Sequence, residues 1–299
     1  MQIFKTIADL RAWRTSVVAP VGFVPTMGFL HEGHLSLIRR ARGENAAVAV
    51  SIFVNPTQFG PHEDFQTYPR DLARDLQLLE PVGVDAVFVP SLEEMYPAGA
   101  STVVSVEALS SSLEGAARPG HFRGVATIVL KLFHLVQPQR AYFGEKDFQQ
   151  LRVIQQMVRD LRMPMEVIGC RTVRERDGLA MSSRNTYLSP AERLAARLLS
   201  HALSHAQEWV GEGEQNAQQL ATYVREILEG EPLARIDYIA VVHPQTLDVL
   251  EMIGPEGAVV CLAVWIGNTR LIDNMPVGAA AHDYLPEVTG PSEDSRLSG

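Results

Sequence analysis

The fold is decided by the stretch VGFVPTMGFLHEGH, which runs from Val21 to His34. Its first part, Val21–Val24, is a short continuous apolar run, the pattern of a strand buried on both faces of a parallel sheet. Leucine, isoleucine and alanine then recur with helical spacing over residues 35–41, and a second valine-rich run, Ala46–Val54, predicts the next strand. The region is therefore a strand–turn–helix–strand unit.

The same alternation of strands and helices continues to about residue 173. Helices are expected over Asp71–Leu79, Gly124–Leu135 and Leu151–Leu161, and strands over Val84–Val89, Ala141–Phe143 and Met165–Val173. We therefore predict an α/β fold, a Rossmann-like doubly wound parallel sheet. Its crossovers are right-handed, so the loops that follow the strands gather at one edge of the sheet.

A smaller domain is expected after Tyr187. The segment Ser189–Glu192 combines an N-cap serine, a first-turn proline and a glutamate three residues after the cap, which indicates the start of a helix. Two amphipathic helices are expected next, over 190–210 and 214–229. They are followed by two strand-like runs, Ile236–Val242 and Ala258–Val264, and Leu271–Ile272 extends this pattern. The predicted organisation is a Rossmann-like domain over 1–187, a C-terminal α+β lid domain over 188–284 and a disordered tail over 285–299.

The composition is that of an ordinary globular protein, with 46% hydrophobic and 20% charged residues among 299. The net charge of −9 opposes binding to nucleic acid, although a local basic cluster can still bind a phosphate ligand. The two cysteines have no metal-ligand spacing and are typical of a reducing compartment. There is no signal-peptide pattern and no long apolar run, so we expect a cytoplasmic protein without membrane or nucleic-acid partners.

The turn after the first strand carries His31-Glu32-Gly33-His34. Histidines three residues apart share one face of a helical turn, and the N–H groups of a helix N-terminus favour anions. Gly33 lets a ring or phosphate approach the backbone. The pattern predicts a cradle for a nucleoside triphosphate with two imidazole donors. The alternatives are a helix cap with two surface histidines and a metal-binding pair, for which no third ligand is evident.

Three further polar segments follow predicted strands. Gly144–Asp147 offers a lysine for a phosphate and an aspartate for that lysine or for a Mg²⁺-bound water, and Gln150 adds a donor and an acceptor. Asn55 and Gln58 can bind hydroxyls and a carboxylate. Met181–Arg184 offers two hydroxyls and a guanidinium for phosphate oxygens. Taken alone, each segment also has a structural interpretation. Gly144–Asp147 is compatible with a helix start, the Asn55 segment with an Asn-Pro turn, and Met181–Arg184 with a polar linker between domains.

The cradle and the later Ser/Ser/Arg loop together form the double signature of adenylyl-transferring α/β proteins, which include class I aminoacyl-tRNA synthetases and small nucleotidyltransferases. The uncharged amides favour a hydroxylated carboxylic acid over a phosphate ester as second substrate. The acidic charge and the lack of an anticodon-binding region disfavour a tRNA synthetase, and a regulatory nucleotide-binding module would not need Lys146 in addition. The glycine-rich segment Glu114–Gly124 indicates either a mobile flap over the site or an exposed turn.

Five segments, in this order and spacing, resemble the pantothenate synthetase family: PTMGFLHEGH, SIFVNPTQF, EGAARPGHFRGVATIVLKLF, YFGEKDFQQL and DGLAMSSRN. The resemblance covers residues 1 to about 280. It implies a pantoate–β-alanine ligase that forms AMP: ATP and (R)-pantoate give pantoyl adenylate and pyrophosphate, and the amine of β-alanine then displaces AMP to give pantothenate. It also implies Mg²⁺, a homodimer and a role in coenzyme A biosynthesis.

The resemblance assigns roles to individual residues. The catalytic positions are His34, His31 and Lys146, which we expect to supply positive charge and donors to the reacting phosphate. The ATP-binding positions are Met27, Gly28, Phe29, Leu30, His31, Glu32, Gly33, His34, Gly144, Glu145, Lys146, Asp147, Val173, Met181, Ser182, Ser183 and Arg184. The positions for pantoate and β-alanine are Gln58, Gln150 and Asn55. Asp75 matches the Mg²⁺ ligand best, although Arg74 precedes it where some relatives carry another acid.

Overall fold

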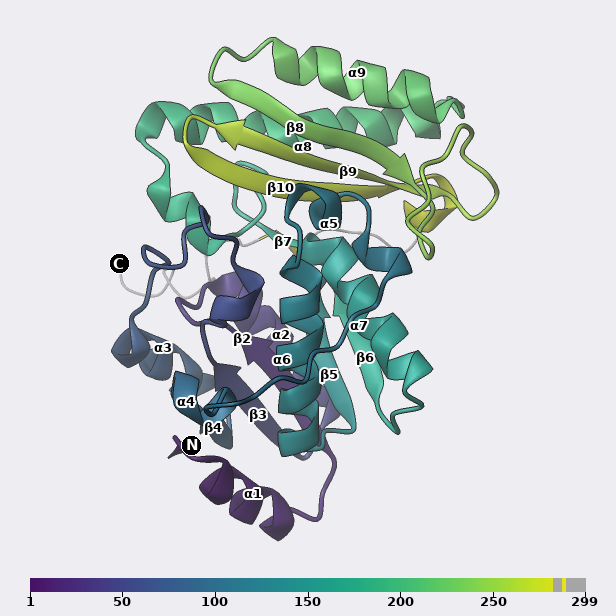
Figure 1. The fold of residues 1–299 in the computed structure, drawn as a ribbon. Helices are drawn as coiled ribbons and strands as arrows, with labels where there is room; N and C mark the ends of the chain where they lie inside the picture. Colours follow the sequence, from purple (N-terminus) through teal and green to yellow (C-terminus); the bar gives the residue numbers. More distant parts are fainter. Residues whose placement is uncertain (282–286, 289–299) are drawn as a thin grey trace, which may run out of the picture. The chain divides into compact units, whose positions relative to one another are not determined.

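The computed structural model describes residues 1–281 and 287–288. Its contacts divide the chain into two compact units (Figure 1). The first is Met1–Cys170 with Gln245–Leu247, and the second is Arg171–Pro244 with the described residues from Asp248 onward. The predicted tail over 285–299 lies, apart from Glu287–Val288, outside the described residues.

The first unit contains the predicted parallel sheet. Six parallel strands are arranged in the order β1-β4-β3-β2-β5-β6, with bounds Gln2–Phe4, Ala86–Phe88, Ala47–Ile52, Val21–Thr26, Arg140–Gly144 and Glu166–Cys170. The doubly wound prediction is confirmed. The sequence did not predict β1 or helix α1 (Ile7–Ser16), since β1 is three residues long and α1 buries only Leu10 and Trp13.

Helices cover both faces of this sheet. Helices α2 (Glu32–Glu44) and α3 (Leu72–Leu79) pack with Val24 on one face, and α1, α6 (His121–Val136) and α7 (Phe148–Asp160) pack with Phe23 on the other. Figure 1 shows α6 and α7 in front of the sheet and α2 behind it. Adjacent residues of β2 thus serve opposite cores, which is why its sequence is continuously apolar.

The order of the strands places a topological switch point between β2 and β5. The chain runs outward from β2 through β3 to β4, and then returns to β5 on the opposite side of β2. Ligands of open α/β sheets bind outside the carboxyl ends of the strands at such a point. The two segments there are residues 27–34, after β2, and residues 145–150, after β5.

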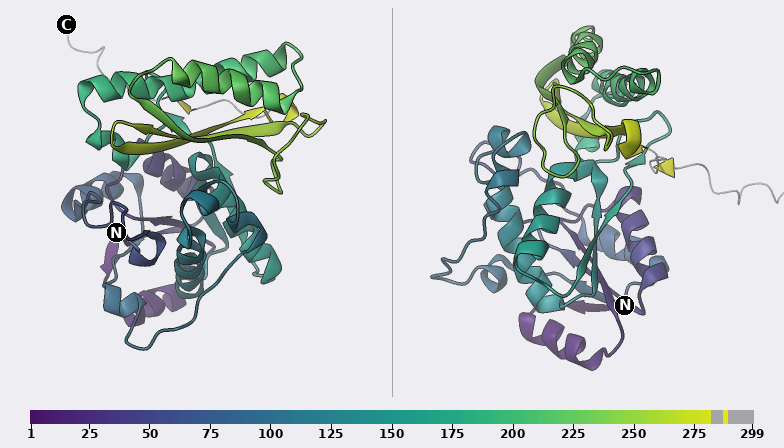
Figure 2. Two further views of the ribbon diagram at one scale, coloured as in Figure 1. Left: turned by 45° about the horizontal axis from the view of Figure 1, so that its top comes forward. Right: turned by 90° about the vertical axis from the view of Figure 1, so that its right-hand side faces the viewer.

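The second unit is a three-stranded antiparallel sheet with two helices. Strands β8 (Ala234–Val242), β9 (Ala258–Ile266) and β10 (Thr269–Val277) pair in sequence order. Helices α8 (Pro190–Gly211) and α9 (Ala217–Glu229) lie side by side on one face (Figure 2). The predicted helix start is confirmed, because the Ser189 side chain accepts from the Glu192 backbone N–H and the Glu192 carboxylate accepts from the Ser189 backbone N–H. Among the described residues, no helix is both long and apolar enough to cross a bilayer.

The second unit begins at Arg171, earlier than the expected boundary at residue 187. Strand β7 (Val173–Arg174) belongs to it because Arg174 forms a bidentate ion pair with Asp273 of β10, with N–O distances of 2.6 and 2.9 Å. Both side chains are almost fully buried. Breaking a buried pair leaves an uncompensated charge and is strongly destabilising, so this pair fixes residues 171–174 to the C-terminal sheet.

The N-terminal end of α6 lies directly against the short 3₁₀ turn η1 (Pro56–Gln58). This approach requires Gly124, because a Cβ atom there would lie 2.3 Å from the carbonyl oxygen of Thr57 and 2.7 Å from Cα of Gln58. The backbone on both sides would have to move to admit even one methyl group. The close approach therefore determines where Gln58 lies relative to α6.

We predict that Gly124→Ala lowers the free energy of unfolding by about 1–3 kcal/mol, as expected for an overpacked contact between two backbones. The matched control is Gly43→Ala in α2, where no atom lies within 4 Å of the added Cβ. There the gain in helix propensity should stabilise the protein by up to about 1 kcal/mol. Urea denaturation of both variants is the measurement, and equal stability of the two would contradict the role given to Gly124.

Candidate active site

The turn after β2 depends on one buried carboxylate. Gly28 and Phe29 both have left-handed backbone conformations, with φ of 81° and 50°. The backbone N–H groups of Phe29 and Leu30 donate to the two oxygens of Asp75, at 2.8 and 2.7 Å. The Asp75 residue is only 1% exposed. Strained backbone persists where its surroundings fix it, and Asp75 of α3 fixes this turn.

Asp75 remains a predicted Mg²⁺ ligand, but its two oxygens already accept the turn's N–H groups. Among the residues that the structure describes, no group of three or more His, Cys, Asp and Glu side chains is arranged to hold a metal ion. Magnesium usually keeps several waters and binds through one or two carboxylates plus substrate phosphates. The residues present therefore fit a magnesium ion that arrives with the triphosphate.

The two histidines lie together at the start of α2, with ring centroids 4.0 Å apart. Burial lowers the pKa of His34 to about 4, while the charge of Asp147 opposes this shift. Burial and the neighbouring His34 lower the pKa of His31 to about 2. Both imidazoles are thus neutral at pH 7. In this form they can act as neutral hydrogen-bonding groups, one of the two ways in which the sequence analysis expected them to serve a phosphate.

The tautomer of His34 follows from its position in the helix cap. The backbone N–H of His31 donates to Nδ1 of His34 at 3.3 Å. Since Nδ1 accepts, the proton of the neutral ring is on Nε2. His34 therefore carries an N–H donor at Nε2, and Nδ1 of His31 is buried with no hydrogen-bond partner in the described part of the chain.

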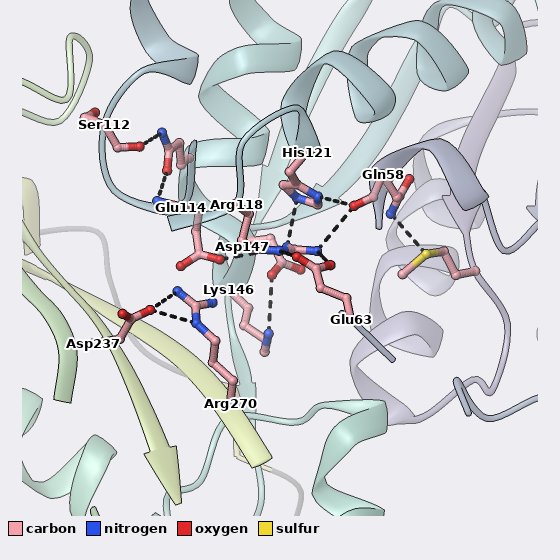
Figure 3. Close-up of polar contacts among 12 residues, drawn as sticks. Gln58, Glu63, Ser112, Glu114, Arg118, His121, Lys146, Asp147, Asp237 and Arg270 are labelled. Carbon is pink, nitrogen blue, oxygen red and sulfur yellow. Dashed lines mark hydrogen bonds and ion pairs between the residues drawn. The ribbon is translucent and has the colours of Figure 1, made fainter. Parts of the chain in front are cut away.

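Lys146 brings a positive charge to the switch point. This residue lies in the 3₁₀ turn η4 (Glu145–Asp147) after β5, and its Nζ is 3.3 Å from Oδ1 of Asp147 (Figure 3). The charge of Lys146 contributes to the lowered pKa of both histidines. The structure thus brings Lys146, His31 and His34 together, as the sequence predicts for a phosphate-binding site.

The amide of Gln58 is held in one orientation. Its Oε1 accepts from Nδ2 of Asn55 at 3.1 Å, and its Nε2 donates to the sulfur of Met27 at 3.1 Å. Asn55 is 1% exposed, and its second amide proton goes to the carbonyl of Gly124 at 3.2 Å. Both donors of Asn55 are therefore committed inside the protein. A direct bond from Asn55 to a substrate would have to replace one of them.

The segment Glu114–Gly124, predicted to be a flap or an exposed turn, is tied to the 59–66 loop by an ion pair. Arg118 binds both oxygens of Glu63, at 2.8 and 2.6 Å, and contacts Nε2 of His121 at 3.1 Å (Figure 3). His121 Nδ1 lies 2.8 Å from the backbone carbonyl of Gln58. Burial and the charge of Arg118 lower the pKa of His121 to about 4, so its neutral ring donates to Gln58 and accepts from Arg118.

Gln149 is a structural residue that the sequence did not single out. It is 5% exposed, accepts from the backbone N–H of Glu114 at 2.9 Å, and donates to the carbonyls of Leu109 and Ser112 at 2.8 and 2.9 Å. Its neighbour Gln150 is half-buried. Two adjacent glutamines look alike in sequence. Only the hydrogen bonds in the structure show that Gln149 holds the start of the Glu114–Gly124 segment.

The remaining predicted ATP-binding residues, Val173 and Met181–Arg184, belong to the second unit. Ser182 begins the 3₁₀ turn η5 (Ser183–Tyr187), and its hydroxyl accepts from the Arg184 backbone N–H at 3.2 Å. Asn185 holds this turn by donating to Glu175 at 2.9 Å. Arg193 in turn pairs with Glu175, so the turn is fixed within its own unit.

Comparisons with known proteins agree with this geometry. The model of the family described as pantoate–β-alanine ligase matches residues 2–276. The pantothenate synthetase of Chloroflexus aggregans is 58% identical over 274 residues, covering 92% of this chain and 99% of its own. The enzyme of Herpetosiphon aurantiacus is 56% identical over 275 residues, covering 92% and 99%.

Solved structures give the same result. A pantothenate synthetase structure from Thermus thermophilus has a TM-score of 0.89 and 54% identity, covering 92% of this chain and 99% of its own. The pantoate–β-alanine ligase of Francisella tularensis, solved in complex with β-γ ATP and β-alanine, has a TM-score of 0.76 and 37% identity, covering 92% and 97%. The chain therefore belongs to the pantoate–β-alanine ligase family, the ATP-dependent ligases of pantothenate biosynthesis.

Proposed function

We propose that this chain makes pantothenate in two steps at the switch point between β2 and β5. In the first, a carboxylate oxygen of pantoate bonds to the α-phosphorus of ATP and the bond to pyrophosphate breaks. In the second, the amine of β-alanine bonds to the acyl carbon, a proton is lost and AMP leaves. The observation that carries the proposal is the pair of neutral imidazoles beside Lys146, at the start of α2.

The proposed division of labour follows from charge. Two anions meet in the first step, so the site must stabilise charge that develops on the phosphate. Lys146 supplies a full positive charge, and the Nε2–H of His34 supplies a donor that keeps its proton. From the family resemblance, Ser182, Ser183 and Arg184 are proposed to bind phosphate oxygens of ATP. A Mg²⁺ ion bound with ATP would add positive charge between the phosphates.

We place pantoate beside Gln58 and Gln150. Amides can hydrogen-bond a hydroxyl and a carboxylate without the strong ion pairing that would stabilise the carboxylate before it attacks. Asn55, a predicted substrate residue, acts in this proposal by orienting Gln58. The clamp between Arg118 and Glu63 would hold the flap and keep water from the acyl adenylate.

Three further proposals rest on the family resemblance. ATP and Mg²⁺ are used together, the protein works in the cytoplasm within coenzyme A biosynthesis, and two copies form a homodimer. The mass measured by sedimentation checks the homodimer.

The rival function, a nucleotidyltransferase acting on a phosphate ester, would need a second cationic pocket. The amides of Gln58 and Gln150 favour the carboxylic acid.

The proposed function predicts that pantoate and ATP alone give a burst of about one pyrophosphate per site, and that β-alanine converts the burst into steady turnover. Loss of the donor in His34→Ala should slow the burst by about 10²–10³-fold. His34→Gln, which keeps an N–H at a similar distance, should recover part of the rate. His134→Ala, at an exposed position of α6, is the control and should behave as wild type.

The pH dependence of the same burst separates a neutral donor from a cation. Because His34 gains its proton only as the pH falls towards about 4, the rate should be constant from about pH 8 to 6 and fall below that range. A cationic His34 with the ordinary pKa of about 6.5 would instead make the rate rise as the pH falls through 6.5. A burst rate that rises in the wild type as the pH falls through 6.5, and does not rise in His34→Gln, would contradict the proposed role of His34 as a neutral donor.

The placement of pantoate predicts that Gln58→Ala and Gln150→Ala each weaken the use of pantoate by roughly tenfold or more, because buried partners are left unpaired. Affinity for ATP alone should change little. ATP titration by calorimetry and the pantoate dependence of pyrophosphate release measure the two effects. Loss of ATP binding with normal pantoate saturation in both variants would mean that these amides face the nucleotide.

A further inference from the structure

We infer that Tyr96 is a positioning residue for the acid substrate, because its hydroxyl fixes the amide of Asn55 and, through it, the amide of Gln58. The inference deepens the proposed function and rests on the placement of pantoate at Gln58. Three consecutive hydrogen bonds carry it: Tyr96 to Asn55, Asn55 to Gln58, and Gln58 to Met27, at 2.9, 3.1 and 3.1 Å.

The first link determines which end of the Asn55 amide is the acceptor. The Tyr96 hydroxyl donates to Oδ1 of Asn55 at 2.9 Å, and the Thr57 hydroxyl donates to the same oxygen at 2.9 Å. The backbone N–H of Thr57, which can only donate, faces this oxygen as well at 3.4 Å, so three donors converge on Oδ1 and make it the accepting end of the amide. Asn55 is 1% exposed, so loss of the Tyr96 hydroxyl would leave its Oδ1 with one donor fewer, and water could not easily replace that donor at the buried oxygen.

The second link transmits this orientation to Gln58. With Oδ1 fixed, the NH₂ group of Asn55 faces Oε1 of Gln58 and the carbonyl of Gly124. Oε1 must therefore accept, and the NH₂ group of Gln58 is directed to the other side. There its partner is the thioether of Met27, which is a weak acceptor. A carboxylate or hydroxyl oxygen of the substrate is a better acceptor and would replace it.

The orientation decides whether the site attracts or repels an acid. Reversal of the Gln58 amide would present a carbonyl oxygen where the NH₂ group now lies. That oxygen and the substrate's carboxylate or hydroxyl oxygen would then face each other, and neither could donate a proton if the substrate group is a carboxylate. The backbone of Gln58 cannot compensate by turning, because its carbonyl is held by His121 at 2.8 Å. The Tyr96 hydroxyl is thus one end of a chain of bonds that ends at the substrate.

Tyr96 is itself held in place independently of its hydroxyl. The ammonium of Lys131 lies 4.2 Å from the centre of its ring, and the ring of Phe53 is 6.4 Å away. Its backbone N–H ends the short helix α4 (Leu92–Met95) by donating to the Leu92 carbonyl at 2.7 Å. Burial raises the pKa of Tyr96, so the phenol keeps its proton.

These contacts make Tyr96→Phe a clean variant, because the ring and its partners remain and only the hydroxyl is lost. We expect the KM for pantoate to rise by roughly 3- to 10-fold, with a much smaller change in kcat and unchanged ATP affinity. Tyr96→Phe combined with Thr57→Val removes both donors to Asn55 and should raise this KM further. Tyr223→Phe, on α9 of the second unit, is the matched control and should leave both constants unchanged.

A double-variant cycle separates positioning from general destabilisation. If Tyr96 acts through the Gln58 amide, Tyr96→Phe should have no further effect on the KM for pantoate in a Gln58→Ala background. Equal effects in both backgrounds, or an unchanged KM in Tyr96→Phe and in the double variant with Thr57→Val, would overturn the inference. Wild-type pyrophosphate release that does not depend on pantoate would instead overturn the proposed function.

Discussion

One buried carboxylate holds the turn on which the rest of the site depends. Two successive residues of this turn have left-handed backbones, and the following N–H groups converge on Asp75 of α3. An uncompensated buried N–H costs about 1–3 kcal/mol, and a charged acceptor strengthens each bond. The position of α2, and with it both histidines, follows from this contact.

The neutral state of the histidines is a consequence of the same packing. The turn buries both rings against each other and beside Lys146, and the cost of desolvating a charged imidazole lowers both pKa values. The His31 backbone N–H then selects the tautomer of His34. In the proposed mechanism, a donor whose protonation state does not change near neutral pH would stabilise charge on the phosphate over the whole physiological range.

A second rigid element stands opposite this turn, around Gln58. The close backbone approach at Gly124 sets its distance from α6, His121 holds its carbonyl, and Asn55 holds its amide. Preorganised groups do not have to reorient as the reaction proceeds, which is the main advantage of a rigid site over solvent. The proposed site therefore combines a nucleotide cradle after β2 with an oriented amide after the neighbouring strand β3.

Local patterns predicted most of this arrangement. The apolar run of β2, the helix signal after it and the polar segments that follow the strands predicted the sheet, the edge at which the loops gather and the cluster of His31, His34 and Lys146. The rest depends on partners far apart in sequence. Asn55 meets Tyr96 41 residues later, and Arg174 meets Asp273 99 residues later. Neither pairing can be recognised from the residues next to it in the sequence. The sequence therefore predicted neither the role of Tyr96 nor the unit boundary at Arg171.

The most direct test of the central role of Asp75 is Asp75→Asn, studied by urea unfolding and by ATP titration with and without Mg²⁺. An amide cannot accept both N–H groups, so we expect a loss of about 2–3 kcal/mol of stability and weaker ATP binding even without the metal. Asp71→Asn, at the N-cap of α3, is the control and should change neither. Wild-type stability and metal-free ATP binding in Asp75→Asn, with only the Mg²⁺ dependence lost, would contradict the account and make Asp75 a metal ligand.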